Sequence, residues 1–289
     1  MANILLEIVA STVDDCLAAE SGGADRIELC AAISTGGLTP SLGTLVEAKE
    51  RGSLPLMAMV RPRAGGFCYS EGDFAAMQRD AEFLLEHGAE GVVFGILHSD
   101  GTVDTTRCGT MLELAGGRQT VFHRAFDVVP DAFRALEELI DLGFTRLLTS
   151  GQQKTALEGS NLIRRLIDRA RERIEVLSGS GIREHNVREL IDATGCTQVH
   201  MTAFSAHVDP SAAASPLHFG SIPGSTPPAY EHVDRETVQR MKETLDAIVQ
   251  KAERSGESRQ EVGSTEVRVS LWEPQREPIL PLAPESRVN

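Results

Sequence analysis

Charged and imidazole side chains interrupt several apolar segments of the sequence, often at positions two residues apart. The clearest case is GADRIELC, residues 23–30, in which Arg26, Glu28 and Cys30 would share one face of a β-strand. Other apolar segments carry Glu7, Arg61 followed by Arg63, His123 and His200. Unpaired charges are costly to bury, so these groups must neutralise one another or a ligand.

The elements that position these residues follow from an alternation of apolar and amphipathic segments. The predicted strands are NILLEIVA (3–10), DRIELC (25–30), PLMAMVRP (55–62), EGVVFGIL (90–97), QTVFHRAF (119–126), TRLLTS (145–150), RIEVLSGSG (173–181) and TQVHMTAF (197–204). The predicted helices are 12–21, 41–51, 72–87, 105–115, 131–142, 157–171, 184–194 and 235–252. Glycines recur just past the expected helix ends, where a left-handed cap is favoured.

Eight strand–helix units of this kind predict an α/β protein, a (β/α)8 TIM-like barrel forming a single domain over residues 1–253. An open doubly wound sheet is the alternative that the pattern alone leaves open. Residues 203–230, rich in Ser, Ala and Pro, predict a long loop at the barrel mouth. Residues 254–289 are polar and Pro-rich and predict a disordered C-terminal tail, in which EVRVSLW, ending at Trp272, could pair as a short edge strand.

The active site of such a barrel lies at the carboxyl ends of its strands. Glu7, Glu28, Arg61, His123 and His200 are expected to converge there. One interpretation is a lattice of ion pairs that only fills the barrel. The other is a small-ligand pocket, which the spread over five strands favours, because an apolar filling would serve stability better.

Composition limits the partners and the compartment. The formal net charge of −14, from 42 acidic and 28 basic residues, argues against nucleic-acid and anionic-membrane surfaces. The N-terminal sequence lacks the features of a signal peptide, which favours a cytoplasmic location. Five cysteines without CxxC spacing fit free thiols in a reducing compartment.

Several stretches closely resemble the CutC family, whose members are described as copper-homeostasis proteins. They are LLEIV, GGADRIELC, GGLTPSLG, VRPRAGGFCYS, EGVVFGIL, VFHRAFDVV, RLLTSGQ and TALEGSNLI. The resemblance extends from the first strand to about residue 203. It implies a (β/α)8 barrel with incomplete or irregular closure, a cytoplasmic location, a homodimer or larger homo-oligomer, and a link to Cu(I), but no established reaction.

The resemblance also assigns positions in this sequence to a site. The family's polar positions at strand ends fall on Glu7, Arg26, Glu28, Arg61, Arg63, Tyr69, His123, Arg124, Asp127, Ser150 and Gly151. Its proposed copper ligands are two cysteines at the ends of strands one and two. The second matches Cys30, whereas Val9 stands where the first would be. His200 is kept in HMTA, with Thr202 in place of the usual serine.

Copper binding is the first functional hypothesis. Cu(I) is soft and prefers thiolate and thioether ligands, so Cys30 with Met57, Met59 and Cys68 could form a site without a second cysteine at Val9. The alternative is that these residues are ordinary core fillers.

The second hypothesis is an enzyme acting on a small anionic or phosphorylated substrate. The turns TSGQ, with Ser150 and Gly151, and SGSGI, with Gly179 and Gly181, could bind a phosphate through backbone N–H groups, although glycine there could serve backbone geometry alone. The remaining assignments complete the predicted site. Arg61, Arg63 and Arg124 would bind the anion, Tyr69 would lie on a flexible loop over the mouth, and His123 with Glu7 or Glu28 would form the acid–base pair.

Overall fold

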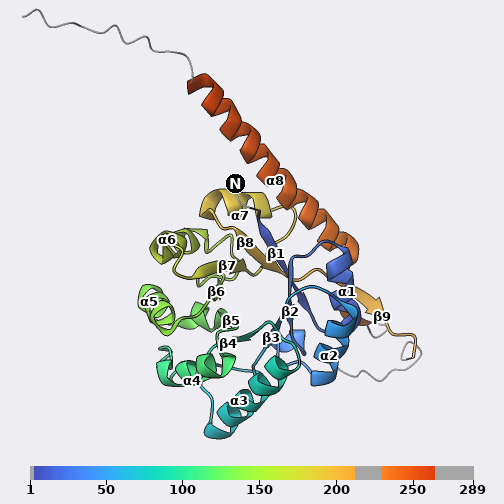
Figure 1. The fold of residues 1–289 in the computed structure, drawn as a ribbon, viewed down its shortest axis with the longest axis vertical. Coiled ribbons are helices and arrows are strands. Elements are labelled where there is room, and N and C mark those ends of the chain that lie inside the picture. Colours follow the sequence, from blue (N-terminus) through green and yellow to red (C-terminus); the bar gives the residue numbers. More distant parts are fainter. Residues whose placement is uncertain (1–2, 212–228, 264–289) are drawn as a thin grey trace, which may run out of the picture.

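Eight parallel strands close into a barrel, in the order in which they occur in the chain (Figure 1). The structure is a computed structural model and describes residues 3–211 and 229–263. The strands are β1 (Leu5–Ala10), β2 (Arg26–Leu29), β3 (Leu56–Met59), β4 (Gly91–Phe94), β5 (Gln119–Phe122), β6 (Arg146–Thr149), β7 (Glu175–Gly179) and β8 (Gln198–Met201). The predicted (β/α)8 barrel is confirmed, and β1 pairs with both β2 and β8. The incomplete or irregular closure that the family resemblance implied is therefore not found.

Helices surround the barrel (Figure 1). They are α1 (Val13–Ser21), α2 (Leu42–Arg51), α3 (Glu71–Glu86), α4 (Thr105–Ala115), α5 (Ala132–Leu142), α6 (Ser160–Ala170), α7 (Val187–Thr194) and α8 (Arg235–Gly263). Short 3-10 turns, η1 (Ile33–Thr35) and η2 (Arg124–Val128), follow β2 and β5. Thr12 and Ser70 start α1 and α3 with capping boxes, which satisfy otherwise unpaired N–H groups at the helix starts.

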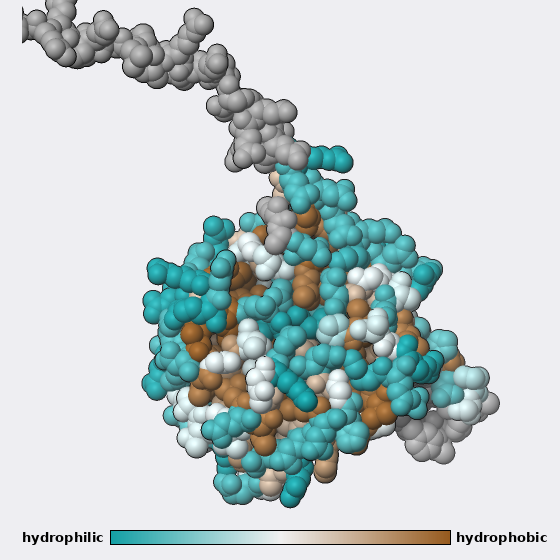
Figure 2. All heavy atoms as spheres, in the orientation of Figure 1, coloured by the Kyte–Doolittle hydropathy of each residue, from teal (hydrophilic) through white to brown (hydrophobic). Residues whose placement is uncertain are grey.

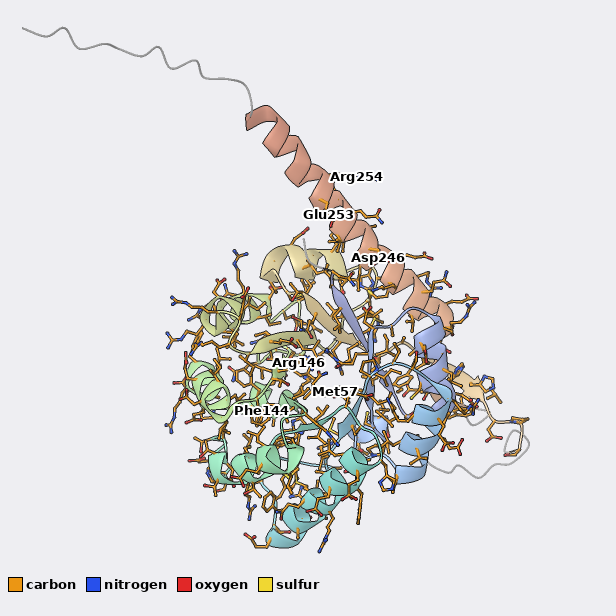
Figure 3. All side chains as sticks on the ribbon, viewed as in Figure 1. Met57, Phe144, Arg146, Asp246, Glu253 and Arg254 are labelled. Atoms are coloured by element: carbon orange, nitrogen blue, oxygen red, sulfur yellow. The ribbon has the colours of Figure 1, made fainter. Side chains whose placement is uncertain are left out.

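Alternate side chains on each strand face two different cores. On β1, Leu6 and Ile8 point outward and belong to the large cluster between strands and helices, whereas Val9 belongs to a small cluster inside the barrel. The inner cluster contains Val9, Cys30, Met57, Met59, Val93, Val121, Leu148 and Leu177. Figure 3 shows the difference, with Met57 and Arg146 in the barrel interior and Phe144 nearer the helices. Figure 2 shows hydrophilic residues over the helices and hydrophobic ones between them.

The segment after β8 differs from the predicted loop at its two ends. β9 (Phe204–Val208) and β10 (Ala229–Val233) form a two-stranded antiparallel ribbon. The ribbon is anchored to α1, because the Val233 N–H donates to Asp15 Oδ1 at 2.7 Å. The middle of the predicted loop, residues 212–228, lies outside the described residues.

The last helix is longer than expected. α8 continues to Gly263, so the predicted start of the tail at residue 254 falls inside a helix that projects from the barrel (Figure 1). The rest of the tail, with EVRVSLW and Trp272, lies outside the described residues. Within the part of the chain that the structure describes, helices long and apolar enough to span a bilayer are not found.

Candidate functional site

A cavity of about 480 Å³ opens at the carboxyl ends of the barrel strands. Eight of the predicted site residues line it: Glu28, Cys30, Arg61, His123, Arg124, Asp127, Gly181 and His200. Apolar groups, including Val9, Met59 and Leu148, complete its inner wall. The convergence expected from the sequence is therefore present for Glu28, Arg61, His123 and His200.

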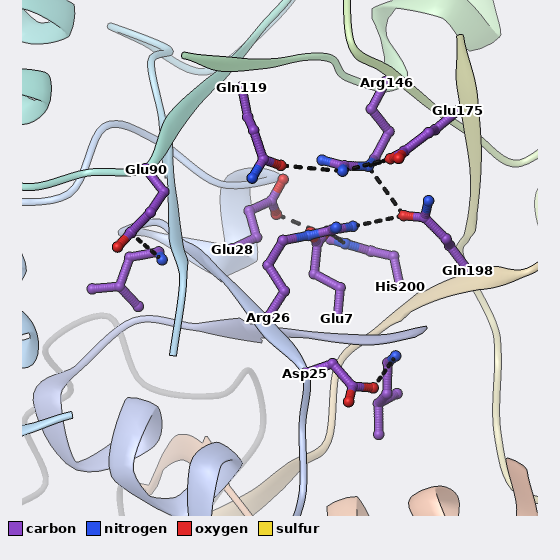
Figure 4. A network of polar contacts seen from close by, with 12 residues as sticks. Glu7, Asp25, Arg26, Glu28, Glu90, Gln119, Arg146, Glu175, Gln198 and His200 are labelled. Atoms are coloured by element: carbon purple, nitrogen blue, oxygen red, sulfur yellow. Dashed lines mark hydrogen bonds and ion pairs between the residues drawn. The ribbon is translucent and has the colours of Figure 1, made fainter. Parts of the chain in front are cut away.

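Glu7, His200 and Glu28 form a buried cluster at the inner end of the cavity (Figure 4). Neighbouring strands bring them together, because Glu7 pairs in register with His200 on β8 and with Arg26 on β2. His200 Nδ1 lies 2.7 Å from Glu7 Oε1, and its Nε2 lies 3.8 Å from Glu28 Oε2. The other Glu7 oxygen, Oε2, accepts a hydrogen bond from Arg26 Nε.

These contacts give the carboxyl groups of Glu7 and Glu28 different pKa values. Burial opposes ionisation of Glu7, but the Arg26 charge and the His200 hydrogen bond outweigh it and lower the pKa of Glu7 to about 2. Burial raises the pKa of Glu28 to about 7, with the nearby Glu7 charge adding to the shift. Burial opposes the charge on His200, but the Glu28 charge and the Glu7 hydrogen bond raise its pKa. Glu28 and His200 are thus both able to hold a proton near neutral pH.

Glu28 has an oxygen with nothing to bind. The residue is 4% exposed, yet Oε1 has no hydrogen-bond partner among the described residues. Buried polar groups are normally paired, so such an atom in a cavity wall indicates a missing partner.

His123 is in a different state from His200. Its Nδ1 accepts a hydrogen bond from the Ala125 N–H at 3.2 Å, which assigns the proton of the neutral ring to Nε2. Burial, reinforced by the Arg61 charge, lowers the pKa of His123 to about 3. Nε2 is buried and finds no partner within residues 3–211 and 229–263. The predicted pairing of His123 with Glu7 or Glu28 is not seen among the described residues, in which both carboxylates lie beside His200 instead.

Arg61 organises the loops around the mouth. Its Nη1 donates to the carbonyl oxygens of Thr35 and Gly37, and its Nη2 donates to that of Gly65, at 2.7 to 3.0 Å. The guanidinium also lies over the Phe67 ring, 5.4 Å from its centroid. Arg61 therefore fixes the loops after β2 and β3 while contributing positive charge to the cavity wall.

Arg63 and Tyr69 lie outside the cavity lining. Arg63 Nε donates to Asp73 Oδ2 at 2.9 Å, and the guanidinium stacks on the Tyr69 ring at 5.1 Å. Arg63 Nη2 also donates to the Cys68 carbonyl. The predicted anion-binding role of Arg63 is not supported by this geometry, because its donors already hold the start of α3 and the preceding loop.

Asp127 holds the turn after β6 and places Arg124 at the rim. Its carboxylate accepts from the Thr149 hydroxyl and from the N–H and hydroxyl of Ser150. Arg124 donates to Asp127 and to Ser150 Oγ, and its side chain remains 43% exposed. Because these backbone and hydroxyl donors are used within the turn, TSGQ does not offer the predicted phosphate-binding amides. At Gly151, φ is +68° and a Cβ would lie 2.3 Å from the Gly159 oxygen, so glycine is required by packing.

The glycines after β7 have separate uses. A Cβ on Gly179 would lie 2.7 Å from Leu148 Cδ1 and 3.2 Å from His200 Cδ2, so this glycine allows the His200 ring to fit. Gly181 lines the cavity with φ of +69°. Arg183, on the same loop, also lines it and was not predicted. Its signal was present, since it follows the glycine-rich SGSGI turn directly.

A second polar network fills the opposite end of the barrel (Figure 4). Arg146 Nε donates to Glu175 at 2.7 Å and to Gln198 at 3.0 Å, and its Nη2 donates to Gln119 at 3.2 Å. Arg26 joins this network by donating to Gln198 Oε1 at 3.0 Å. Of its members only Arg26 was predicted to belong to a site, although one signal was present for the others: five strands begin with a polar residue, namely Arg26, Gln119, Arg146, Glu175 and Gln198.

Cys30 lines the cavity as a buried thiol. Burial, with the Glu28 charge nearby, raises the pKa of Cys30 well above its ordinary value. A Cβ at Gly37 would lie 3.4 Å from Cys30 Sγ and 3.6 Å from Met59 Cε, so thiol and thioether border the same spot. Cys68 is exposed and absent from the cavity lining. The soft donors at the cavity are thus Cys30 and Met59, with apolar Val9 beside them.

Fold and site together define a (β/α)8 barrel with a polar, partly unpaired cavity at the end where this class of fold carries its active sites. The chain belongs to the CutC family, whose model matches residues 4–205. This confirms the resemblance seen in the sequence.

Relatives extend the match beyond that segment. A protein from Treponema denticola named family protein CutC is 45% identical over 249 residues, covering 86% of this chain and 100% of that protein. The human copper homeostasis protein cutC homolog is 43% identical over 201 residues, covering 70% of this chain and 74% of that protein. The crystal structure of a CutC protein from Streptococcus agalactiae matches with a TM-score of 0.66 and 33% identity, over 68% of this chain and 97% of that one.

Proposed function

We propose that the cavity binds a small anionic molecule and carries out acid–base chemistry on it, with Glu28 and His200 as the proton-transfer pair. The observation that carries this proposal is the unpaired, buried Oε1 of Glu28 beside His200. A group whose pKa lies near neutral pH can both accept and release a proton. Glu7 would act through His200, holding Nδ1 so that Nε2 faces Glu28.

His123 supplies a different function in this proposal. Because its Nδ1 accepts from a backbone N–H, Nε2 is a fixed hydrogen-bond donor. A neutral imidazole donor suits a carbonyl or carboxylate oxygen of the ligand. The low pKa of His123 keeps this donor uncharged across the physiological range.

The rim supplies the charge that selects an anion. Arg124 is half-exposed and held in place by Asp127, and Arg183 lines the cavity from the loop after β7. Guanidinium groups bind carboxylates and phosphates through paired N–H donors. The ligand would therefore place its anionic end at the rim and its reacting end at Glu28.

Ligand-induced stabilisation tests this proposal. Inorganic phosphate, small hydroxy acids and small sugar phosphates would be screened by thermal unfolding, and a ligand at 100 times its Kd should stabilise the fold by about 2.7 kcal/mol. Glu28→Gln should weaken the binding of an active compound, whereas Glu175→Gln, in the opposite network, should leave it unchanged. A broad screen without any shift, or equal effects of the two substitutions, would refute the proposed site.

Copper is the second candidate, because Cys30 and Met59 border one spot in the same cavity and mammalian relatives are named as copper homeostasis protein homologs. In this proposal the chain acts in copper homeostasis, with Cu(I) as cargo bound by these soft donors in the cytoplasm. Binding must release the Cys30 proton, since the thiol is protonated in the free protein.

Anaerobic Cu(I) titration separates the two candidates. Cu(I) should bind at a defined stoichiometry, Cys30→Ser should abolish the binding, and the exposed-cysteine control Cys68→Ser should retain it. Stoichiometric binding that survives Cys30→Ser would reject this copper site and leave the acid–base proposal untouched.

A further inference from the structure

Two histidines share one face of the β9–β10 ribbon, which lies almost entirely beyond the segment matched by the family model. In the antiparallel register His207 is opposite Tyr230, and Ser205 is opposite His232. Residues directly opposite each other, and residues two apart on one strand, share a face. His207, Tyr230 and His232 therefore project from the same side of the ribbon.

The side chains on this face are in contact. The ring centroids of His207 and His232 are 5.1 Å apart, with ring planes at 84°. The Tyr230 ring lies 5.4 Å from His207, and Ser205 Oγ lies 3.3 Å from His232 Nε2. His207 is exposed, so its nitrogens are accessible to an ion from solvent.

A carboxylate follows at the end of the same strand. Asp209 lies two residues after His207, one residue past the end of β9. Asp209 Oδ1 accepts hydrogen bonds from the Ser211 N–H at 2.8 Å and from the Ser211 hydroxyl at 2.6 Å, so this carboxylate is engaged in its own turn. The donors that the ribbon brings together are therefore the two imidazoles, which suit divalent transition metals.

The ribbon is held in a way that would preorganise such a site. β10 is anchored to α1 by the bond from the Val233 N–H to Asp15, and the Asp234 N–H donates to the Ala203 carbonyl at 2.8 Å. The strands bearing His207 and His232 are thereby fixed at the end near the barrel, and ordering the ligands costs less on a fixed ribbon.

We propose that His207 and His232 form a two-histidine surface site for a divalent transition-metal ion. Imidazole nitrogen favours Cu(II) over Zn(II) in the usual order of affinities, so Cu(II) binds more tightly. The site is separate from the cavity and from its thiol, and it does not depend on the function proposed there. A Cu(I) site at Cys30 and a Cu(II) site on the ribbon would differ in oxidation state and in ligand type.

Isothermal titration of the full chain with Cu(II), and with Zn(II) in parallel, tests the site. Loss of a group that only hydrogen-bonds to a metal ligand lowers metal affinity about 10-fold to 100-fold. Loss of a ligand itself should have at least the smaller of these effects, so His207→Ala and His232→Ala should each weaken binding at least about tenfold. The double variant should bind one Cu(II) fewer than the wild type. His185→Ala, which removes an exposed histidine on a different segment, is the matched control and should bind like the wild type.

Nuclear magnetic resonance locates the ion independently of the affinities. Zn(II) should shift the imidazole nitrogen signals of both ribbon histidines together. The proposal is overturned if the double variant keeps the wild-type stoichiometry, if only one of the two histidines matters, or if His185→Ala has an equal effect. Any of these results would leave the His207–Tyr230–His232 cluster as aromatic packing alone.

Discussion

The two ends of the barrel interior contain similar kinds of residues but differ in how completely the buried polar groups are hydrogen-bonded. At the amino-terminal end of the strands, Arg146 is held by Glu175, Gln198 and Gln119, and only its Nη1 is left without a partner among the described groups. At the carboxyl end, Glu28 Oε1 and His123 Nε2 both lack partners within the described part of the chain, although both residues are 4% exposed.

This difference is the one expected if the charges at the amino-terminal end are structural and the polar groups at the carboxyl end bind a ligand. A paired network fills space and fixes the arrangement of strands, whereas unpaired buried groups cost stability and persist where a ligand satisfies them. Glu7 lies at the boundary, because one of its oxygens accepts from Arg26 of the paired network and the other contacts His200 of the cavity. The lattice interpretation of the sequence thus describes the amino-terminal end of the barrel, and the small-ligand pocket stays a proposal for the carboxyl end.

Breaking the paired network should have the largest effect on stability. Arg26→Met leaves the Glu7 carboxylate buried without its cation, and breaking such a buried pair costs about 3 to 5 kcal/mol. Urea unfolding at neutral pH measures the change. A decrease in unfolding free energy below about 1 kcal/mol would show that the polar network at the amino-terminal end of the strands does not stabilise the fold.

Removing the unpaired carboxylate should have a smaller effect, with opposite sign and a distinct pH dependence. The pKa of Glu28 is raised from 4.5 to about 7, so between these values the folded protein keeps a proton that the unfolded chain has lost. Unfolding free energy therefore falls as pH rises from 4.5 to 7, by about 3 kcal/mol in all. Glu28→Gln has no carboxyl group to titrate, so its unfolding free energy should not fall in this way and should exceed that of the wild type over that range. Urea unfolding at several pH values measures the difference.

Glu7→Gln is the matched control for that comparison. The pKa of Glu7 is lowered to about 2, so its contribution to stability is present above pH 4.5 and is lost as pH falls toward 2. This variant should be destabilised at neutral pH, where Glu28→Gln is stabilised. Changes of the same sign in both variants would contradict the contrast between the two carboxylates.

The rim should show the smallest effect on stability. Arg124→Met removes a half-exposed guanidinium whose partner Asp127 keeps its bonds from Thr149 and Ser150, so the fold should lose no more than about 1 kcal/mol. The same variant should reduce the stabilisation by any anionic ligand found in the screen. If thermal unfolding with that ligand gave an unchanged shift, the rim would have no part in anion binding.

Periodicity made the fold and much of the cavity predictable. Apolar strands separated by amphipathic helices gave the barrel, and the location of barrel sites at strand ends brought Glu28, Arg61, His123 and His200 to one cavity. Glycine spacing marked most helix ends within a residue or two, because the left-handed cap is a local requirement.

Partner choice could not be predicted, because it depends on strand register and side-chain rotamers. Glu7 contacts His200 since β1 pairs with β8, a contact between residues 193 positions apart. Arg63 carries the same charge as Arg124, yet it turns toward Asp73 and Tyr69 and leaves the cavity. The β9–β10 ribbon was missed because most of its residues are exposed, so its strands carry little apolar pattern, although Val233 at the end of β10 is buried.

The protonation states of His123 and His200 decide whether the cavity can carry out the proposed acid–base chemistry. Nitrogen-15 magnetic resonance of labelled protein, titrated from pH 5 to 8, would report on both rings. We expect His123 to stay neutral throughout with its proton on Nε2, and His200 to keep its extra proton to a pH above 6.5. Ordinary titration of both rings near pH 6.5 would contradict an enclosed acid–base cavity with a fixed neutral donor.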